Sequence, residues 1–357
     1  MNQPVNILGI ESSCDETGCA LVANGQDVLA NIVASQIDLH ARYGGVVPEI
    51  ASRAHIEAVN TVISAAMERS ALRPDEIAAV AVTSEPGLIG SLLVGLMAAK
   101  TVAWVWDVPL LSVNHVRGHT YAAALNDDPI DYPALALICS GGHTAIYDCR
   151  SPVDQRLLGS TIDDAAGEAF DKVASILHLG YPGGPAIEQA ATTGDPKAVR
   201  FPRALLKGQS LDFSFSGLKT AVLYHVNGVP GTRRSGRRRE LPRVHHPGGI
   251  ENFDEQEIAD IAASFQSAVV EVLTAKLARA ARRLRPRTLL IGGGVAANES
   301  LRAAVSELAG ELDCNIRLPK MEFCLDNAAM IAGLGYHYYR SGCFAGLDLE
   351  ARATVRH

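Results

Sequence analysis

The sequence predicts an α/β fold made of two related halves that face a cleft. Short apolar segments with the pattern of strands alternate along the chain with longer segments of helical apolar spacing. An apolar strand, a polar or small-residue turn and a returning strand occur together twice, at residues 6–22 and at residues 135–147, which indicates a duplication. The 357 residues, 48% of them hydrophobic, are enough for two such units.

In the first half, strands and helices are expected to alternate after this first unit. Residues 11–17 form its polar turn. Asn114 precedes a segment of helical spacing that continues to residue 124, so its side chain can cap a helix there. The expected strands are 6–10, 19–22, 77–83 and 109–113, and the expected helices are 50–68, 90–105 and 115–124.

The second half has the same alternation, with small-residue turns after its strands. The rigid turn at residues 181–185 is expected to lead into a helix that begins near Ala186. Residues 228–249, rich in Gly, Pro and Arg, predict an exposed loop, and residues 349–357 predict a polar tail. The expected strands are 135–139, 145–147 and 288–291, and the other expected helices are 163–177 and 255–284.

Composition and charge predict a soluble, cytoplasmic globular protein with no membrane segment. The formal net charge of −7 argues against a protein that wraps nucleic acid, although a local basic patch can still bind a polyanion. Seven cysteines without a CxxC pair fit a reducing compartment. The N-terminus carries no basic segment, and no apolar run has the length of a membrane span.

His115 and His119 are the most informative pair of residues, because side chains four residues apart on a helix share one face and can bind one metal ion. With 11 histidines in this chain, roughly 0.3 such pairs are expected by chance, so two histidines satisfied by polar neighbours are an open alternative. Asp326 is the candidate third ligand, although capping of the following helix is the simpler explanation of that residue. A His, His, Asp set leaves coordination positions open for a substrate.

Three glycine- or serine-containing turns follow apolar strands, at residues 11–17, 140–144 and 292–298. Backbone N–H groups in such turns can bind a phosphate, which favours a nucleotide held between the two halves; tight turns alone are the alternative. Neither a Walker A lysine nor a GxGxxG fingerprint is present. Four acids near the second turn could hold ribose, metal or water, or form a solvated helix face: Asp163, Asp164, Glu168 and Asp171.

Read together, these segments resemble the tRNA adenosine threonylcarbamoyltransferases (TsaD), a family with the actin-like, sugar-kinase-like ATPase (ASKHA) fold. The resemblance covers roughly residues 6 to 340, with its motifs in order. These motifs are residues 10–17, 86–95, 113–119, 140–144, 180–185, 213–220, 292–298 and 326–329. It implies a first α/β subdomain at residues 1–130, which carries the HxxxH metal motif, and a second at residues 131–340, whose C-terminal helix packs back on the first.

The resemblance also implies a site and a reaction. His115, His119 and Asp326 would bind one divalent metal ion per subunit, with Fe²⁺ as the expected ion and Zn²⁺ as the alternative. Threonylcarbamoyl-AMP or ATP would bind at Ile138, Cys139, Ser140, Gly141, Gly142, Asp171, Gly184, Glu188 and Asn298. The family is a metal-dependent acyltransferase that moves the threonylcarbamoyl group from threonylcarbamoyl-AMP to N6 of adenosine 37, in tRNAs that read codons beginning with A. The products are t6A37 and AMP, and no residue of the sequence stands out as general base.

The implied partners are tRNA, a paralogous TsaB-like protein and a small TsaE-like ATPase, with a TsaC-like synthase supplying threonylcarbamoyl-AMP. Glu85 stands where the family usually has glycine, and Leu325 stands where threonine is common; neither removes a proposed ligand. The segment 228–249 resembles an insertion into the family pattern. Its arginines predict weak contact with tRNA phosphates, against a plain solvated loop as the alternative.

The sequence leaves two alternatives to a threonylcarbamoyltransferase. One is a zinc metallopeptidase, since the family has historically carried the label glycoprotease. Val116 stands where the HExxH motif of such enzymes has its glutamate, so this alternative lacks its carboxylate base. The other is a nucleotide-binding regulator without catalysis.

Overall fold

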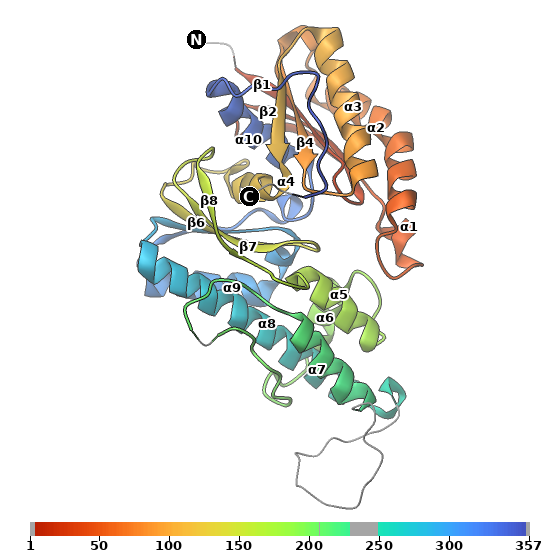
Figure 1. The fold of residues 1–357 in the computed structure, drawn as a ribbon, viewed down its shortest axis with the longest axis vertical. Helices are drawn as coiled ribbons and strands as arrows, with labels where there is room; N and C mark the ends of the chain where they lie inside the picture. The colour runs from red at the N-terminus through yellow and green to blue at the C-terminus, as the bar shows by residue number, and fades with distance from the viewer. Residues whose placement is uncertain (1–3, 207, 229–248, 355–357) are drawn as a thin grey trace, which may run out of the picture.

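The computed structural model describes residues 4–206, 208–228 and 249–354, which form two five-stranded sheets with helices packed on them (Figure 1). The first sheet has the strand order β3-β2-β1-β4-β5 and the second has the order β10-β9-β6-β7-β8. The strands of the first sheet are β1 (Asn6–Glu11), β2 (Glu16–Ala23), β3 (Asp27–Ser35), β4 (Ile77–Glu85) and β5 (Leu110–Asn114). Those of the second are β6 (Ala134–Cys139), β7 (Thr144–Cys149), β8 (Gln155–Ser160), β9 (Thr288–Gly292) and β10 (Asn315–Arg317).

The two sheets share one plan, which confirms the predicted duplication. The leading strand of each sheet pairs antiparallel with the strand that follows it and parallel with the fourth strand of its half. In both sheets the third strand adds antiparallel to the second, and the fifth adds parallel to the fourth. The leading strands are buried along their whole length, as their continuous apolar runs require.

Helices cover the first sheet on both faces. Figure 1 shows α2 and α3 along one side of this sheet and α10 on the other. Gly9 of β1 permits the close approach of α10, because a Cβ at this position would clash with the backbone of Ala328 and with Ala332. The helices of this half are α1 (Ile37–Ala41), α2 (Pro48–Ser70), α3 (Ile89–Trp106), α4 (His115–Tyr121) and, from the end of the chain, α10 (Ala328–Arg340).

The helices of the second half pack around a core rich in phenylalanine and aliphatic residues. The longest, α8, matches the predicted range and begins at a capping box formed by Asp254 and Glu257. The helices are α5 (Ala166–Ile176), α6 (Gly183–Ala191), α7 (Ser216–Asn227), α8 (Glu255–Leu284) and α9 (Glu299–Glu311). Short 3₁₀ turns lie at Pro74–Glu76, Ala122–Ala124, Ile250–Asn252, Gly294–Ala297 and Met321–Phe323.

Several element boundaries differ from the prediction for local reasons. Helix α5 begins at Ala166, three residues late, because Asp163 instead accepts hydrogen bonds from the backbone N–H groups of Phe215 and Ser216. Helix α6 begins at Gly183 and not near Ala186. The α-helix after Asn114 ends at Tyr121 and continues as a 3₁₀ turn. Helix α7 was not predicted; its first residues, 216–220, lie in the motif 213–220, which was read only as a resemblance.

Two segments were predicted to lie outside the two halves: the loop at 228–249 and the tail at 349–357. Residues 229–248 lie outside the described residues, so the exposed-loop prediction for 228–249 stays a prediction. The described part of the expected polar tail runs along the first sheet, with Leu349 and Ala351 against its core. The backbone N–H of Arg352 donates to the carbonyl of Ser84 at 2.8 Å, which fixes the segment beside the end of β4.

Helices α3 and α8 are long and apolar enough to span a membrane by length and composition. In α8, 61% of the apolar window is buried inside the protein, as in a core helix, whereas in α3 the share is 33%. Helix α3 therefore keeps an exposed apolar face in this fold.

A pH-dependent contribution to stability is expected from His337 of α10, whose Nε2 lies 2.7 Å from the Tyr121 hydroxyl. Burial, with the charge of Arg340 adding to it, lowers the pKa of His337 to about 4, against an unfolded value of about 6.5. Between these values the unfolded chain binds more protons, so the free energy of unfolding falls as the pH falls.

Replacing His337 with Gln keeps a polar partner for Tyr121 and removes the titration. We expect the wild type to lose about 1–2 kcal/mol more stability than His337→Gln between pH 7 and pH 5. Urea unfolding at both pH values measures the difference. Equal losses in the two proteins would show that His337 titrates alike in the folded and unfolded chains.

Candidate metal centre and nucleotide cavity

Helix α4 presents both predicted histidines at the end of β5. The Asn114 side chain caps the helix by accepting a hydrogen bond from the backbone N–H of Arg117 at 3.1 Å, as expected. The four-residue spacing then places the rings of His115 and His119 side by side, with their centroids 4.8 Å apart. Both side chains are buried, and among the described residues Nδ1 of His119 has no hydrogen-bond partner.

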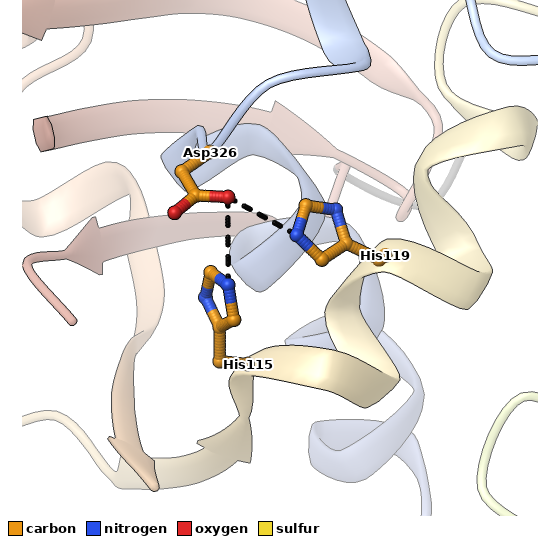
Figure 2. A group of neighbouring side chains, drawn as sticks. All are labelled: His115, His119 and Asp326. Carbon is orange, nitrogen blue, oxygen red and sulfur yellow. Dashed lines mark hydrogen bonds and ion pairs between the residues drawn. The ribbon is translucent and has the colours of Figure 1, made fainter. Parts of the chain in front are cut away.

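Asp326 meets the two histidines from the loop that precedes α10 (Figure 2). Its Oδ1 lies 3.1 Å from Nε2 of His119 and 3.4 Å from Nε2 of His115. The capping alternative for this residue does not hold, because the neighbouring Asn327 caps α10 by accepting from the backbone N–H of Met330 at 3.0 Å. The Asp326 carboxylate is therefore free to face the histidines.

The three side chains suit a transition-metal ion. Each offers one donor atom, and these atoms lie within 4.8 Å of one another. Two imidazole nitrogens and a carboxylate oxygen form the donor set of mononuclear zinc and non-haem iron(II) sites with open positions. Burial raises the pKa of Asp326, but the two histidines outweigh burial and hold that pKa well below its usual range. A buried carboxylate between two imidazoles favours a cation at this position.

Glu11, at the end of β1, orients His115 from behind. Its Oε2 lies 2.9 Å from Nδ1 of His115, which directs Nε2 of the same ring toward Asp326. The carboxylate also accepts hydrogen bonds from the backbone N–H of Ser13 and from the hydroxyl of Thr83, each at 2.6 Å. Burial raises the pKa of Glu11, yet His115 outweighs burial and the pKa is lowered. Glu11 is completely buried and supports His115, the candidate ligand, as a fixed anion.

Glu11 was not singled out in the sequence, although one signal was present. It is a charged residue directly after an apolar strand, at the edge where ligands of α/β sheets bind. The sequence could not show which residue Glu11 faces, because 104 residues separate it from His115.

A cavity of about 700 Å³ extends from this cluster into the space between the two halves. His115 and Asp326 line it, together with residues 13–16 of the first turn. Most of the predicted nucleotide residues line it too: Ser140, Gly141, Gly142, Asp171, Gly184, Glu188 and Asn298. Ile138 and Cys139 do not, because both are buried inside β6. The candidate metal cluster and the predicted nucleotide turns therefore share one cavity.

The polar residues of the cavity are held by hydrogen bonds of their own. Asp171 accepts from the backbone N–H of Gly183 at 2.7 Å, and burial raises the pKa of its carboxyl. Glu188 accepts from the backbone N–H of Glu299 at 2.7 Å. Asn298 caps α9, with its side-chain oxygen 3.0 Å from the N–H of Leu301. These three side chains reach the cavity from α5, α6 and the start of α9 in fixed orientations.

The other three acids proposed near the second turn lie elsewhere. Asp163 supports the start of α7. Asp164 pairs with Lys172 and Lys219, each at 3.1 Å, and Glu168 pairs with Lys172 at 2.6 Å. Only Asp171 of the four lines the cavity.

His143 and Ala353 are among the cavity residues that were not predicted as site residues. His143 follows the glycines of the second turn, and its ring centroid lies 6.4 Å from that of His115. Burial, with the charges of His115 and His119 adding to it, lowers the pKa of His143 to about 4, so its imidazole is neutral at pH 7. Ala353 lines the cavity from the C-terminal segment. A glycine turn predicts phosphate contacts but does not show which of its side chains points inward.

The repeated sheet plan and the cavity between the halves define a two-lobed, actin-like (ASKHA) nucleotide-binding fold. HypF from T. kodakarensis shares this fold with a TM-score of 0.58 at 14% identity, over 95% of this chain and 49% of that chain. The (R)-2-hydroxyglutaryl-CoA dehydratase component A of Acidaminococcus fermentans shares it with a TM-score of 0.51 at 14% identity, over 94% and 99%. At this identity the likeness shows the fold alone.

The family model for TsaD, tRNA N6-adenosine threonylcarbamoyltransferase, matches residues 27–333. Proteins of that name from Anaeromyxobacter dehalogenans and Thermomicrobium roseum are each 50% identical to this chain; each alignment covers 98% of this chain, and 99% and 96% of the respective relative. The chain belongs to the tRNA N6-adenosine threonylcarbamoyltransferase family. The resemblance stated from the sequence is confirmed, and the transferase prediction is favoured over the peptidase and the regulator.

Proposed function

We propose that this protein transfers a threonylcarbamoyl group from threonylcarbamoyl-AMP to N6 of adenosine 37, in tRNAs that read codons beginning with A. The observation that carries the proposal is the His, His, Asp cluster beside a cavity that is also lined by residues of the turns after β1, β6 and β9. Such a cavity can hold an adenylate with its acyl group against the cluster. Family membership supports the identity of that acyl group.

In this reaction the exocyclic amine attacks the carbamoyl carbon, the bond from that carbon to the phosphate oxygen breaks, AMP leaves and the amine loses a proton. Gly141, Gly142 and Gly294 line the cavity and would supply backbone N–H groups for the phosphate. The metal ion would be held by His115, His119 and Asp326. We propose Fe²⁺ as this ion, with Zn²⁺ as the alternative. When bound there, the ion would supply Lewis-acid chemistry for the carbamoyl group. Glu11 keeps the ring of His115 in position.

A reconstituted transfer assay tests the function. The protein, loaded with metal, is incubated with threonylcarbamoyl-AMP, unmodified tRNA and the TsaB-like and TsaE-like proteins of the same genome, and the nucleosides are analysed by mass spectrometry. The expected products are t6A and AMP in equal amounts. The control tRNA carries guanosine at position 37 and should stay unmodified. Peptide cleavage, or nucleotide binding without modified tRNA, would instead support one of the alternatives.

The nucleotide assignment for Asp171 leads to a separate prediction. Asp171→Ala removes a half-buried carboxylate that lines the cavity and leaves the N–H of Gly183 without its partner. The Kd for AMP should rise by about tenfold or more, since a hydrogen bond to a charged group contributes roughly 1.5–3 kcal/mol. Isothermal titration measures it. Glu168→Gln, on the same helix but outside the cavity, is the matched control; an unchanged Kd for Asp171→Ala would remove this residue from the nucleotide site.

We place the TsaB-like partner on the apolar face of α3, defined as the exposed side chains of Ile89, Leu93, Met97, Trp104 and Val105, which are 46–73% exposed. The first three recur every four residues, the spacing with which one helix packs on another. Ile56 of α2, 63% exposed, adds an apolar side chain from the neighbouring helix. We also propose that the protein is cytoplasmic, that a TsaE-like ATPase is a further partner, and that a TsaC-like synthase supplies threonylcarbamoyl-AMP. A binding assay distinguishes the TsaB-like partner from the competing occupant of the apolar face of α3, which is a second copy of this chain.

A further inference from the structure

The turn between β1 and β2 contacts the metal cluster on one side. The hydroxyl of Ser13 lies 3.1 Å from Nδ1 of His115, and the backbone N–H of Ser13 donates to Oε1 of Glu11 at 2.6 Å. The other oxygen of Glu11 contacts the same ring nitrogen at 2.9 Å. The position of this turn therefore determines how His115 is held.

On its other side the turn is hydrogen-bonded to α3 through Ser12. The hydroxyl of Ser12 donates to the carbonyl of Ser91 at 2.8 Å and accepts from the backbone N–H of Gly95 at 3.1 Å. Residues 91 and 95 are four apart, so these two groups would bond to each other in a regular helix. The Ser12 hydroxyl thus lies between the two ends of one helical hydrogen bond, a kind of insertion that bends helices.

The sequence of α3 is adapted to this contact. A Cβ at Gly95 would collide with the Ser12 hydroxyl, so glycine is required for the approach. The backbone N–H of Leu88, just before the helix, donates to the carbonyl of Ser13 at 2.8 Å. Ser12 is 1% exposed, so its hydroxyl has no access to water as a replacement partner.

Helix α2 binds the same turn through His55. Nε2 of His55 lies 3.0 Å from the carbonyl of Cys14, and Nδ1 lies 2.7 Å from the hydroxyl of Thr17. His55 is completely buried, whereas the adjacent Ile56 is exposed. The two helices that carry the exposed apolar side chains are therefore both hydrogen-bonded to the turn that supports the metal ligand.

We propose that Ser12 is a positioning residue that couples binding of a protein partner on the apolar face of α3 to metal binding at His115. The proposal rests on the partner site proposed above. A partner that packs on Leu93 and Met97 fixes the curvature of α3 at the point where Ser12 is inserted. The adjacent Ser13 and Glu11 then hold His115 in one orientation. Because coupling between two binding sites is reciprocal, metal should strengthen partner binding by the same factor as the partner strengthens metal binding.

The experiment measures two dissociation constants, neither of which depends on catalysis. The Kd of the TsaB-like protein from the same genome is measured with metal-free protein and with protein saturated with Co²⁺, and the Kd of Co²⁺ is measured with and without the partner. In the wild type both should change by the same factor, about fivefold or more. In Ser12→Ala the factor by which Co²⁺ and the partner change each other's Kd should fall to about one. The variant should still bind the partner and Co²⁺ separately.

Ser91→Ala is the matched control, because the Ser91 hydroxyl is buried in the same place and has no hydrogen-bond partner among the described residues. It should keep the wild-type coupling factor. Gly95→Ala is a second test variant, which perturbs the same contact from the helix side. It should also reduce the coupling factor, and it replaces Ser12→Ala as the test if Ser12→Ala fails to fold.

The outcomes separate the coupling from the function on which it rests. A wild-type complex with the same Kd in the presence and absence of Co²⁺ overturns the coupling, as does full coupling in Ser12→Ala. If no complex forms in any condition, the partner site is wrong and the coupling is rejected with it. Transfer activity in the reconstituted assay is an independent readout, so a failure of the proposed reaction is recognised separately.

Discussion

Replacing Asp326 with alanine is expected to remove metal binding and threonylcarbamoyl transfer together, with transfer reduced roughly 10²-fold or more. Its Oδ1 lies 3.4 Å from Nε2 of His115 and 3.1 Å from Nε2 of His119. Without it, two imidazoles on one helix are left as the described metal donors of the cluster. The fold should be retained, because Asn327 and not Asp326 caps α10.

Metal content by elemental analysis and transfer by t6A formation are measured on the same preparations. His115→Ala should behave like Asp326→Ala. Glu322→Gln serves as the control, since Glu322 is an exposed acid four residues before Asp326 and does not line the cavity. Normal transfer by Asp326→Ala after metal removal would refute the role of this cluster in the reaction.

The second large effect is expected at Glu11. Glu11→Gln keeps the size of the side chain and removes the negative charge that faces Nδ1 of His115 at 2.9 Å. Residues that orient a metal-ligating histidine typically contribute 10- to 100-fold to metal affinity, so the Kd of Zn²⁺ or Co²⁺ should rise by about that factor. Competition with a chelator of known affinity measures the change.

Thr83→Val provides a graded comparison. It removes one hydrogen bond to Glu11, of 2.6 Å, and leaves the carboxylate in place. Its effect on metal affinity should therefore be in the same direction and smaller than that of Glu11→Gln. The same affinity in Glu11→Gln as in the wild type would mean that the Glu11 charge does not support the ligand.

Local pattern was sufficient for much of the fold. The repeated strand-turn-strand units, the long helix α8 and the capped helix α4 could all be predicted, because apolar periodicity and capping act between residues a few positions apart. The match to the TsaD family confirms the motif-based assignment. The start of α5 was predicted less well, because Asp163 has its partners at Phe215 and Ser216, outside any local window.

The order of the residues already determined that His115 and His119 share a helical face and that a carboxylate and an amide precede α10. Whether Asp326 or Asn327 caps that helix was open, since both side chains can accept a backbone N–H. The tertiary structure decided which residue is the cap. The side chain of Asn327 accepts the N–H of Met330, and the side chain of Asp326 instead faces His115 and His119. Glu11 and Ser12 likewise acquired their roles only when the first turn packed between α4 and α3. Hydrogen-bond partners of buried polar groups are chosen across the packed core, and chain distances such as the 207 residues between His119 and Asp326 hide them from any pattern in the sequence.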